Sequence, residues 1–161
     1  MIYAEQTTVS SERSRAEIES TLGRYGATSF AYMWQGLRAV ILFEYNGKRI
    51  KFMLTLPDRN DNQFRLTPER RTVRSADAQN KAYEQAVRQK WRALALVIKA
   101  KLEAVESGIS VFEEEFMANI VLPNGQTAAE NILPQIDEAY RIGGMPKIML
   151  LEGGGNENKN T

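Results

Sequence analysis

Apolar residues recur at helical spacing over residues 80–107, a stretch that contains neither Gly nor Pro. Apolar steps of three and four residues are typical of a helix with one buried face. The pattern therefore predicts a long central helix, with Asp77 or Asn80 as its N-cap and Gly108 just beyond its end. The predicted buried positions are Tyr83, Val87, Trp91, Leu94, Ile98, Leu102 and Val105.

Alternating apolar and polar residues predict three strands before this helix, over residues 28–34, 38–45 and 48–56. Asn46-Gly47 is the typical pair of a type I′ hairpin turn, and it places Phe43 opposite Ile50. A second two-residue turn at 35–36 places Tyr32 opposite Ala39. Both turns align one apolar face of a meander: Phe30, Tyr32, Ile41, Phe43, Ile50, Phe52 and Leu54.

Three capping-box patterns, in which Ser or Thr precedes Glu by three residues, predict shorter helices. They begin at Ser14, Ser110 and Thr127. The first helix extends to residue 25, the second docks on the core through two phenylalanines, and Pro134 interrupts or kinks the third. The long polar connection over residues 57–76 is of the length that is usually functional or disordered.

These elements predict an α+β fold, in which a three-stranded antiparallel meander packs on one long central helix, with short N- and C-terminal helices. Residues 1–13 are expected to be a flexible N-terminus, residues 14–150 a single domain, and residues 151–161 a flexible polar tail.

The 161-residue chain contains no Cys and no His, which excludes disulfides, zinc sites built on these residues, Cys nucleophiles and His general bases. Restriction-type nuclease cores share the element order, but they need an acid on one strand and an acid-x-Lys on the next. Here Glu44 is the only acid of the second strand, the third strand has none, and Asp58 and Asp61 are typical turn residues. We expect no enzymatic activity and no cofactor or metal.

No apolar stretch approaches the roughly 20 residues of a membrane span, and no signal-peptide pattern opens the sequence. The sequence therefore favours the cytoplasm and predicts no membrane association.

The net charge of the chain is +1, but the charges are unevenly distributed. Residues 65–101 carry ten basic and three acidic groups, a net charge of +7, whereas residues 102–161 carry three basic and ten acidic groups, a net charge of −7. Such segregation bears on partners rather than on fold.

The basic region provides the candidate site, because rows of Arg and Lys neutralise nucleic-acid phosphates. The candidate nucleic-acid-binding residues are Arg65, Arg70, Arg71, Arg74, Lys81, Arg88, Arg92 and Lys99. The alternative interpretation is a solvated helix face, with loop arginines that pair with the acidic third of the same chain. Most aromatic residues are expected in the core, while Trp34 and Tyr45 at strand ends are expected to be partly exposed.

The stretches RSRAEIESTLGRYGA, RQKWRALALVIKAKLEAVESGI and FEEEFMANIVLPNGQT resemble a family of small proteins encoded by phages and prophages, over roughly residues 14–146. The resemblance implies a bacteriophage or mobile-element context in the bacterial cytoplasm, and it supplies no catalytic residue. The order of elements is also similar, in topology alone, to the core of single-strand annealing recombination proteins.

Two functions are open at this point. The first is a phage-derived, non-enzymatic accessory protein that binds nucleic acid without sequence specificity, through the basic helix and loop. The alternative is a protein-interaction module, such as an inhibitor or regulator of a host bacterial protein. Its acidic and basic portions would then be docking surfaces or the two halves of a homo-oligomer contact.

Overall fold

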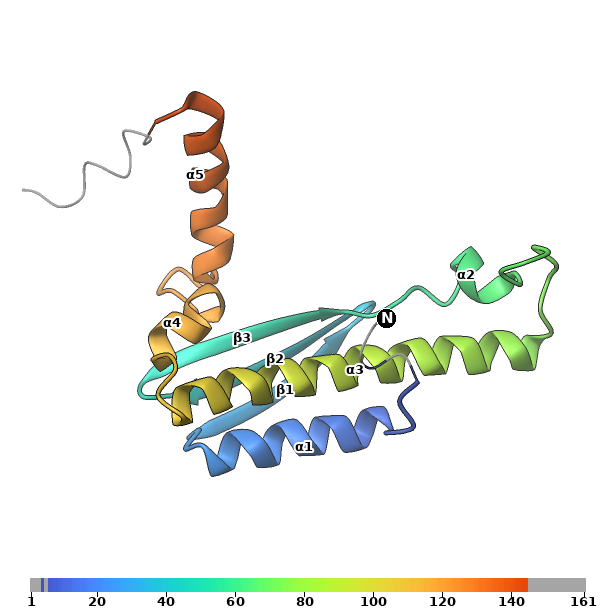
Figure 1. Ribbon diagram of the computed structural model, residues 1–161, viewed down its shortest axis with the longest axis horizontal. Coiled ribbons are helices and arrows are strands. Elements are labelled where there is room, and N and C mark those ends of the chain that lie inside the picture. Colours follow the sequence, from blue (N-terminus) through green and yellow to red (C-terminus); the bar gives the residue numbers. More distant parts are fainter. Residues whose placement is uncertain (1–3, 5, 145–161) are drawn as a thin grey trace, which may run out of the picture.

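The computed structural model describes residue 4 and residues 6–144. Three strands form one antiparallel sheet in the order β1-β2-β3, with β1 at Ser29–Gln35, β2 at Arg38–Tyr45 and β3 at Lys48–Thr55. The helices α1 (Ser11–Arg24) and α3 (Ala76–Glu106) lie side by side against the sheet (Figure 1). The predicted α+β fold, a meander on one long helix, is confirmed.

The β2–β3 hairpin has the predicted register, with Phe43 opposite Ile50 and Asn46-Gly47 at the turn. Both turn residues adopt positive φ, 48° and 71°, as a type I′ turn requires. The predicted β1–β2 register is wrong by two residues. In the structure Gln35 pairs with Arg38, so the turn lies at 36–37 and not at 35–36. A slip of two residues leaves every side chain on its predicted face, since the period of a strand is two.

The core lies between this sheet face and the helices. Ile18 and Leu22 of α1 are buried, as are Trp91 and Ile98 of α3. From the sheet the core takes Ala39, Ile41, Phe43, Ile50 and Phe52. Tyr32, which was predicted on the same face, is exposed because β1 is an edge strand with little cover.

The N-cap of α1 lies four residues earlier than predicted. Ser10 is its N-cap and accepts a hydrogen bond from the backbone N–H of Arg13. The predicted capping box at Ser14 is wrong, because Ser14 lies inside the helix and is buried. Burial of the small Ser14 side chain is consistent with the close packing of α1 on α3.

The helix α3 is 31 residues long, which corresponds to about 46 Å. Its N-cap is Ser75, which bonds the backbone N–H of Ala78, so the prediction of Asp77 or Asn80 is wrong. The C-terminal prediction is confirmed, because Gly108 adopts a left-handed φ of 72° just past the end. Trp91, Ile98 and Leu102 of the predicted stripe are buried, whereas Tyr83, Val87, Leu94 and Val105 are half-buried.

The connection from β3 to α3 has its own structure. It contains the short helix α2 (Asn62–Arg65), whose N-cap is Asp61, and an isolated bridge between Leu66 and Val73. This segment lies at the end of the molecule opposite the C-terminal helix α5 (Ala128–Ile142; Figure 1).

After α3, Phe112 and Phe116 of α4 (Phe112–Phe116) are buried in the core, as predicted. The capping box at Ser110 is wrong, because the N-cap is Val111 and no side chain caps this helix. The following turn, η1 (Met117–Asn119), leads to Ile120, which forms an antiparallel bridge with Ile50 at the outer edge of β3.

The last described helix is α5 (Ala128–Ile142). Its capping box between Thr127 and Glu130 is present as predicted, and Gly143 ends the helix at a left-handed φ of 66°. Pro134 does not interrupt it. The helix does not cover the core: it extends away from the sheet (Figure 1), and Ala128 alone of its residues is buried. The predicted polar tail, 151–161, lies outside the described residues.

Candidate nucleic-acid interface

The structure divides the eight candidate cations into two groups. Four lie on α3, at Lys81, Arg88, Arg92 and Lys99, and four lie on the connection before it, at Arg65, Arg70, Arg71 and Arg74. The two groups differ in how the rest of the chain compensates their charge.

Two α3 cations pair with carboxylates one helical turn earlier. Lys81 Nζ lies 2.8 Å from Asp77 Oδ2, and Arg88 Nη1 lies 4.0 Å from Glu84 Oε2. Arg88 also donates two hydrogen bonds to the Gln85 side chain, at 2.6 and 3.1 Å. Pairs with this spacing stabilise a helix modestly, and their net charge is zero.

The third α3 cation, Arg92, connects two helices. Its guanidinium donates to the carboxylate of Glu17 on α1, and both side chains are partly buried. Arg92 is therefore part of the α1–α3 contact and is not offered to an outside partner. The related Lys101, which is not among the candidates, donates to the Glu115 carbonyl at 2.6 Å and holds α4.

Lys99 is exposed and has no ion pair within the described part of the chain. It lies eleven residues beyond Arg88, a separation of about 16 Å along the helix. The predicted continuous cationic stripe along α3 is thus reduced to one isolated charge.

The loop arginines are brought together by a short hairpin, residues 65–74, which we call the arginine hairpin. Its base is closed by a hydrogen bond from Arg74 N to Arg65 O at 2.8 Å, and its middle by one from Thr67 to Thr72 at 2.8 Å. Arg70 and Arg71 lie at the turn, where Arg71 adopts a φ of 52°. Arg65 and Arg74, nine residues apart in sequence, are therefore adjacent at the base of the hairpin.

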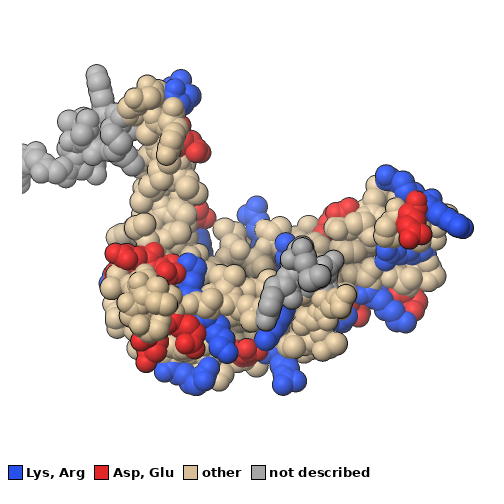
Figure 2. Space-filling view, viewed as in Figure 1, with Lys and Arg blue, Asp and Glu red and all other residues tan. Residues whose placement is uncertain are grey.

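The arginine hairpin carries uncompensated positive charge. Its four arginines face one acid of the same segment, Glu69, which gives a net charge of +3. Within the described residues, Arg65, Arg70, Arg71 and Arg74 form no ion pair with any carboxylate. Figure 2 shows Lys and Arg gathered at this end of the molecule, with acidic atoms beside them.

The hairpin is attached to α3 through aromatic contacts that the sequence reasoning missed. Phe64 is buried and meets the Tyr83 ring edge-on at 5.7 Å. Arg59 lies over the same ring, 4.5 Å from its centroid, and donates to Asn80 at 2.7 Å. A signal was present in the sequence, since Phe64 is the only aromatic residue of the polar connection.

Of the two aromatics expected at strand ends, Trp34 is 67% exposed. Tyr45 is half-buried and stacks on Phe112 with ring centroids 4.1 Å apart. The sheet register places Trp34 opposite Ala39, which pairs with Leu54 just before the connection begins. Trp34 is thus at the end of the sheet from which the chain departs toward the arginine hairpin.

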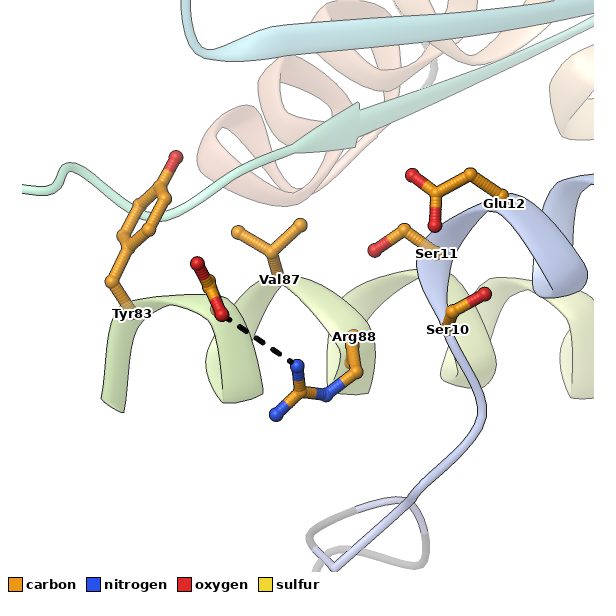
Figure 3. A pocket seen from close by; sticks show the side chains of 7 residues that line it. Ser10, Ser11, Glu12, Tyr83, Val87 and Arg88 are labelled. Atoms are coloured by element: carbon orange, nitrogen blue, oxygen red, sulfur yellow. Dashed lines mark ion pairs between the residues drawn. The ribbon is translucent and has the colours of Figure 1, made fainter. Parts of the chain in front are cut away.

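A pocket lies where the start of α1 meets α3 (Figure 3). Ser10, Ser11 and Glu12 line one side, and Val87 and Arg88 lie on the other. A hydrogen bond from its own backbone amide, followed by the Coulomb attraction of nearby Arg15, holds the pKa of Glu12 below its usual value. Two carboxylates, Glu12 and Glu84, face one guanidinium, so the pocket is not an attractive site for an anion.

The described residues provide no group of three or more His, Cys, Asp or Glu side chains that could hold a metal ion. Asp58 and Asp61 are engaged locally, as expected of turn residues: Asp58 accepts from the backbone N–H of Asn60 at 2.8 Å, and Asp61 caps α2. No helix within the described ranges has both the length and the apolar character needed to cross a bilayer.

In comparisons with known proteins, no family model, no curated protein and no solved structure matches this chain.

Proposed function

We propose that this protein is a non-enzymatic nucleic-acid-binding accessory protein that holds the phosphate backbone through the arginine hairpin, residues 65–74. The observation that carries the proposal is the contrast between the two groups of cations. Lys81, Arg88 and Arg92 have carboxylate partners, whereas the four hairpin arginines have none among the described residues.

Phosphate binding suits this arrangement, because each guanidinium that neutralises a phosphate releases counterions and adds to the affinity. The arginines lie on a loop rather than on a helix that would enter a groove, so binding independent of sequence is expected. Trp34 adds an exposed ring on which an unpaired base can stack. The same proposal places the protein in a bacterial cytoplasm, in a phage or prophage context.

The test compares two double variants with equal loss of charge. Arg65→Ala/Arg70→Ala removes two hairpin cations, and Arg13→Ala/Arg24→Ala removes two exposed cations of α1, which have no ion pair in the described part of the chain. Binding of a labelled single strand and of a labelled duplex is measured by fluorescence anisotropy over a range of salt concentrations.

We expect the hairpin variant to lose affinity several-fold and to reduce the slope of log K against log salt by about two. The control is expected to change the slope by well under one. Equal effects of the two variants, or no binding by the parent protein at low salt, would exclude the hairpin as the site.

A protein-interaction module is the second candidate, and one specific observation favours it. The helix α5 extends from the body and exposes Leu133, Ile136 and Tyr140. Exposed apolar patches are typical of protein–protein contacts. The two functions are compatible, because the arginine hairpin and α5 lie at opposite ends of the molecule (Figure 1).

A further inference from the structure

The end of the sheet from which the chain leaves toward the arginine hairpin carries an aromatic ring without a ring or cation contact of its own. Tyr32 of β1 is held by two neighbours, because its ring meets that of Trp91 edge-on at 5.5 Å and the Arg15 guanidinium lies 5.1 Å from its centroid. Trp34 follows two residues later on the same face and is 67% exposed. Among the described residues it meets no aromatic ring and no cation. Its ring is therefore free to stack on a flat partner.

A further arginine without a carboxylate partner lies on the connection before the hairpin. Arg59 is exposed, lies 4.5 Å from the centroid of the Tyr83 ring and donates to Asn80 Oδ1 at 2.7 Å. Both partners are neutral, and within the described part of the chain Arg59 forms no ion pair. The neighbouring Asp58 and Asp61 accept from backbone N–H groups instead, at 2.8 and 3.3 Å. The guanidinium is thus held in place with its charge available to a phosphate.

The helix α3 relates these groups to the hairpin along one axis. The base of the arginine hairpin adjoins Ser75, Arg59 lies at Tyr83, and the aromatic end of β1 lies at Trp91. Residues 75, 83 and 91 are spaced by eight, which is about 12 Å each time and about 24 Å in all. Figure 1 shows β1 running toward the N-terminal end of α3. The chain therefore presents a ring, a single cation and a cluster of four cations in this order.

A single strand suits this row better than a duplex. One strand carries a phosphate about every 3.4 Å when it is stacked, so about 24 Å corresponds to about seven nucleotides, or to fewer when the strand is extended. Its unpaired bases can turn toward Trp34 while its phosphates meet the arginines. The bases of a duplex are paired and stacked on one another, so a duplex offers its phosphates alone to this surface and gains nothing from Trp34.

We propose that the ligand is a single-stranded nucleic acid that runs from Trp34 past Arg59 to the arginine hairpin and occupies about four to seven nucleotides. The inference rests on the proposed function, because it takes the hairpin as the principal phosphate contact. It assigns two further roles: Arg59 binds a phosphate in the middle of the site, and Trp34 stacks a base at its end. These contacts are to phosphates and base faces, which DNA and RNA share.

The length of the strand tests this path. Fluorescence anisotropy measures the affinity of the full chain for end-labelled oligothymidylates of about 3 to about 12 nucleotides, with oligouridylates in parallel. We expect the affinity to rise about tenfold or more up to about eight nucleotides and then to level off, because the second contact becomes intramolecular once the strand reaches Trp34. This gain should disappear in Trp34→Ala. The same gain in Trp34→Ala as in the parent would overturn the path.

Arg59→Ala tests the middle of the site. Its matched control is Arg49→Ala, which removes an exposed arginine without an ion pair in the described residues, beside the β2–β3 turn at the other end of the sheet. For a strand of about 12 nucleotides, Arg59→Ala should weaken binding about fivefold and reduce the slope of log K against log salt by about 0.7, the value for one phosphate of a single strand. Its duplex affinity should stay within about twofold of the parent, and Arg49→Ala should change neither affinity.

Failure of this inference differs from failure of the proposed function. If the parent binds single strands and duplexes alike, or if Arg59→Ala weakens both alike, the path is wrong and the hairpin remains the site. If the parent binds neither at low salt, the proposed function fails as well. Length-dependent binding of oligothymidylate or of oligouridylate supports the path, and the tighter of the two identifies the source of the strand.

Discussion

Arg92 on α3 donates to the carboxylate of Glu17 on α1, 75 residues earlier in the chain. A cation that the sequence pattern places on a binding stripe therefore belongs to the contact between two core helices. The same relationship makes charge reversal at Arg92 an unsuitable test of nucleic-acid binding, because it would place two carboxylates together in a partly buried contact.

A double-mutant cycle separates the two roles of Arg92. We expect Arg92→Ala and Glu17→Ala each to destabilise the fold, with a coupling energy of about 0.5–1 kcal/mol, because the pair is partly solvated. Urea denaturation measures these changes. Nucleic-acid affinity of the folded Arg92→Ala variant should stay within twofold of the parent at equal salt. A reduction of the salt slope by one unit would instead assign Arg92 to the phosphate contact.

Some of these pairings could be predicted from the sequence and others could not. Asp77–Lys81 and Glu84–Arg88 follow the four-residue spacing of helical ion pairs. The sequence alone therefore indicates that the charges of Lys81 and Arg88 are neutralised by acidic residues of the same helix. The Glu17–Arg92 pair depends on how α1 packs on α3, which no local pattern contains. The arginine hairpin likewise required the structure, since the bridge from Leu66 to Val73 has no clear signal in the sequence.

The fold was predictable where local chemistry and packing agree. Asn46-Gly47 specifies its turn unambiguously, and the β2–β3 register follows from it. At Gln35, Gly36 and Leu37 two turns preserve the same buried face, so the apolar pattern could not choose between registers two residues apart. Ser10 and Ser14 are both acceptable caps by residue type, and only the packing of α1 decides that Ser14 is internal.

Ser14 offers a test of stability, because its Oγ is buried and has no hydrogen-bond partner within the described structure. Removing an unsatisfied buried hydroxyl should not cost stability, and Ala is the better helix former. We expect Ser14→Ala to stabilise the protein by about 0.5–1.5 kcal/mol in urea denaturation. The control Ser20→Ala, at an exposed position of α1, should give only the smaller gain from helix propensity. Destabilisation by Ser14→Ala would mean that the hydroxyl has a partner.

The two tryptophans provide a direct readout of binding, because Trp34 is 67% exposed and Trp91 is 1% exposed. If bases stack on Trp34, a single strand should quench roughly half of the emission, and a duplex should quench much less. Trp34→Phe should abolish the quenching and weaken single-strand binding only slightly, while Trp34→Ala should weaken it by about 1–3 kcal/mol. Quenching that persists in Trp34→Phe would exclude Trp34 as the stacking residue.

Phe64 should control the order of the arginine hairpin, since it buries its ring against Tyr83 of α3. Phe64→Ala removes the main apolar anchor of the connection while leaving all four hairpin arginines in place. Trypsin should then cleave within residues 65–74 many times faster than in the parent, and nucleic-acid affinity should fall because the hairpin must be ordered on binding. Phe64→Leu is the conservative control. Unchanged proteolysis of Phe64→Ala would show that Arg59 and the backbone bonds suffice to hold the segment.

The attachment of α5 should depend on pH through Glu130. Its carboxylate accepts the backbone N–H of Thr127 at 2.7 Å and lies 3.1 Å from Lys51 Nζ. The hydrogen bond from Thr127, followed by that from Lys51, holds the pKa of Glu130 below its usual value of 4.5. A depressed pKa in the folded state means that the stabilisation is complete above the unfolded value and is lost as the pH falls through the folded value.

Glu130→Gln isolates this effect, because Gln retains the capping geometry but carries no charge. Hydrogen exchange of the α5 amides should be faster in Glu130→Gln than in the parent at neutral pH. The difference should shrink as the pH falls from 4.5 through the lowered pKa of Glu130, below which the parent carboxylate is protonated as well. Asp137→Asn serves as the control, since it removes a charge from the same helix at a position with no ion pair among the described residues. A difference between parent and Glu130→Gln that persists at low pH would assign the effect to the shape of the side chain rather than to its charge.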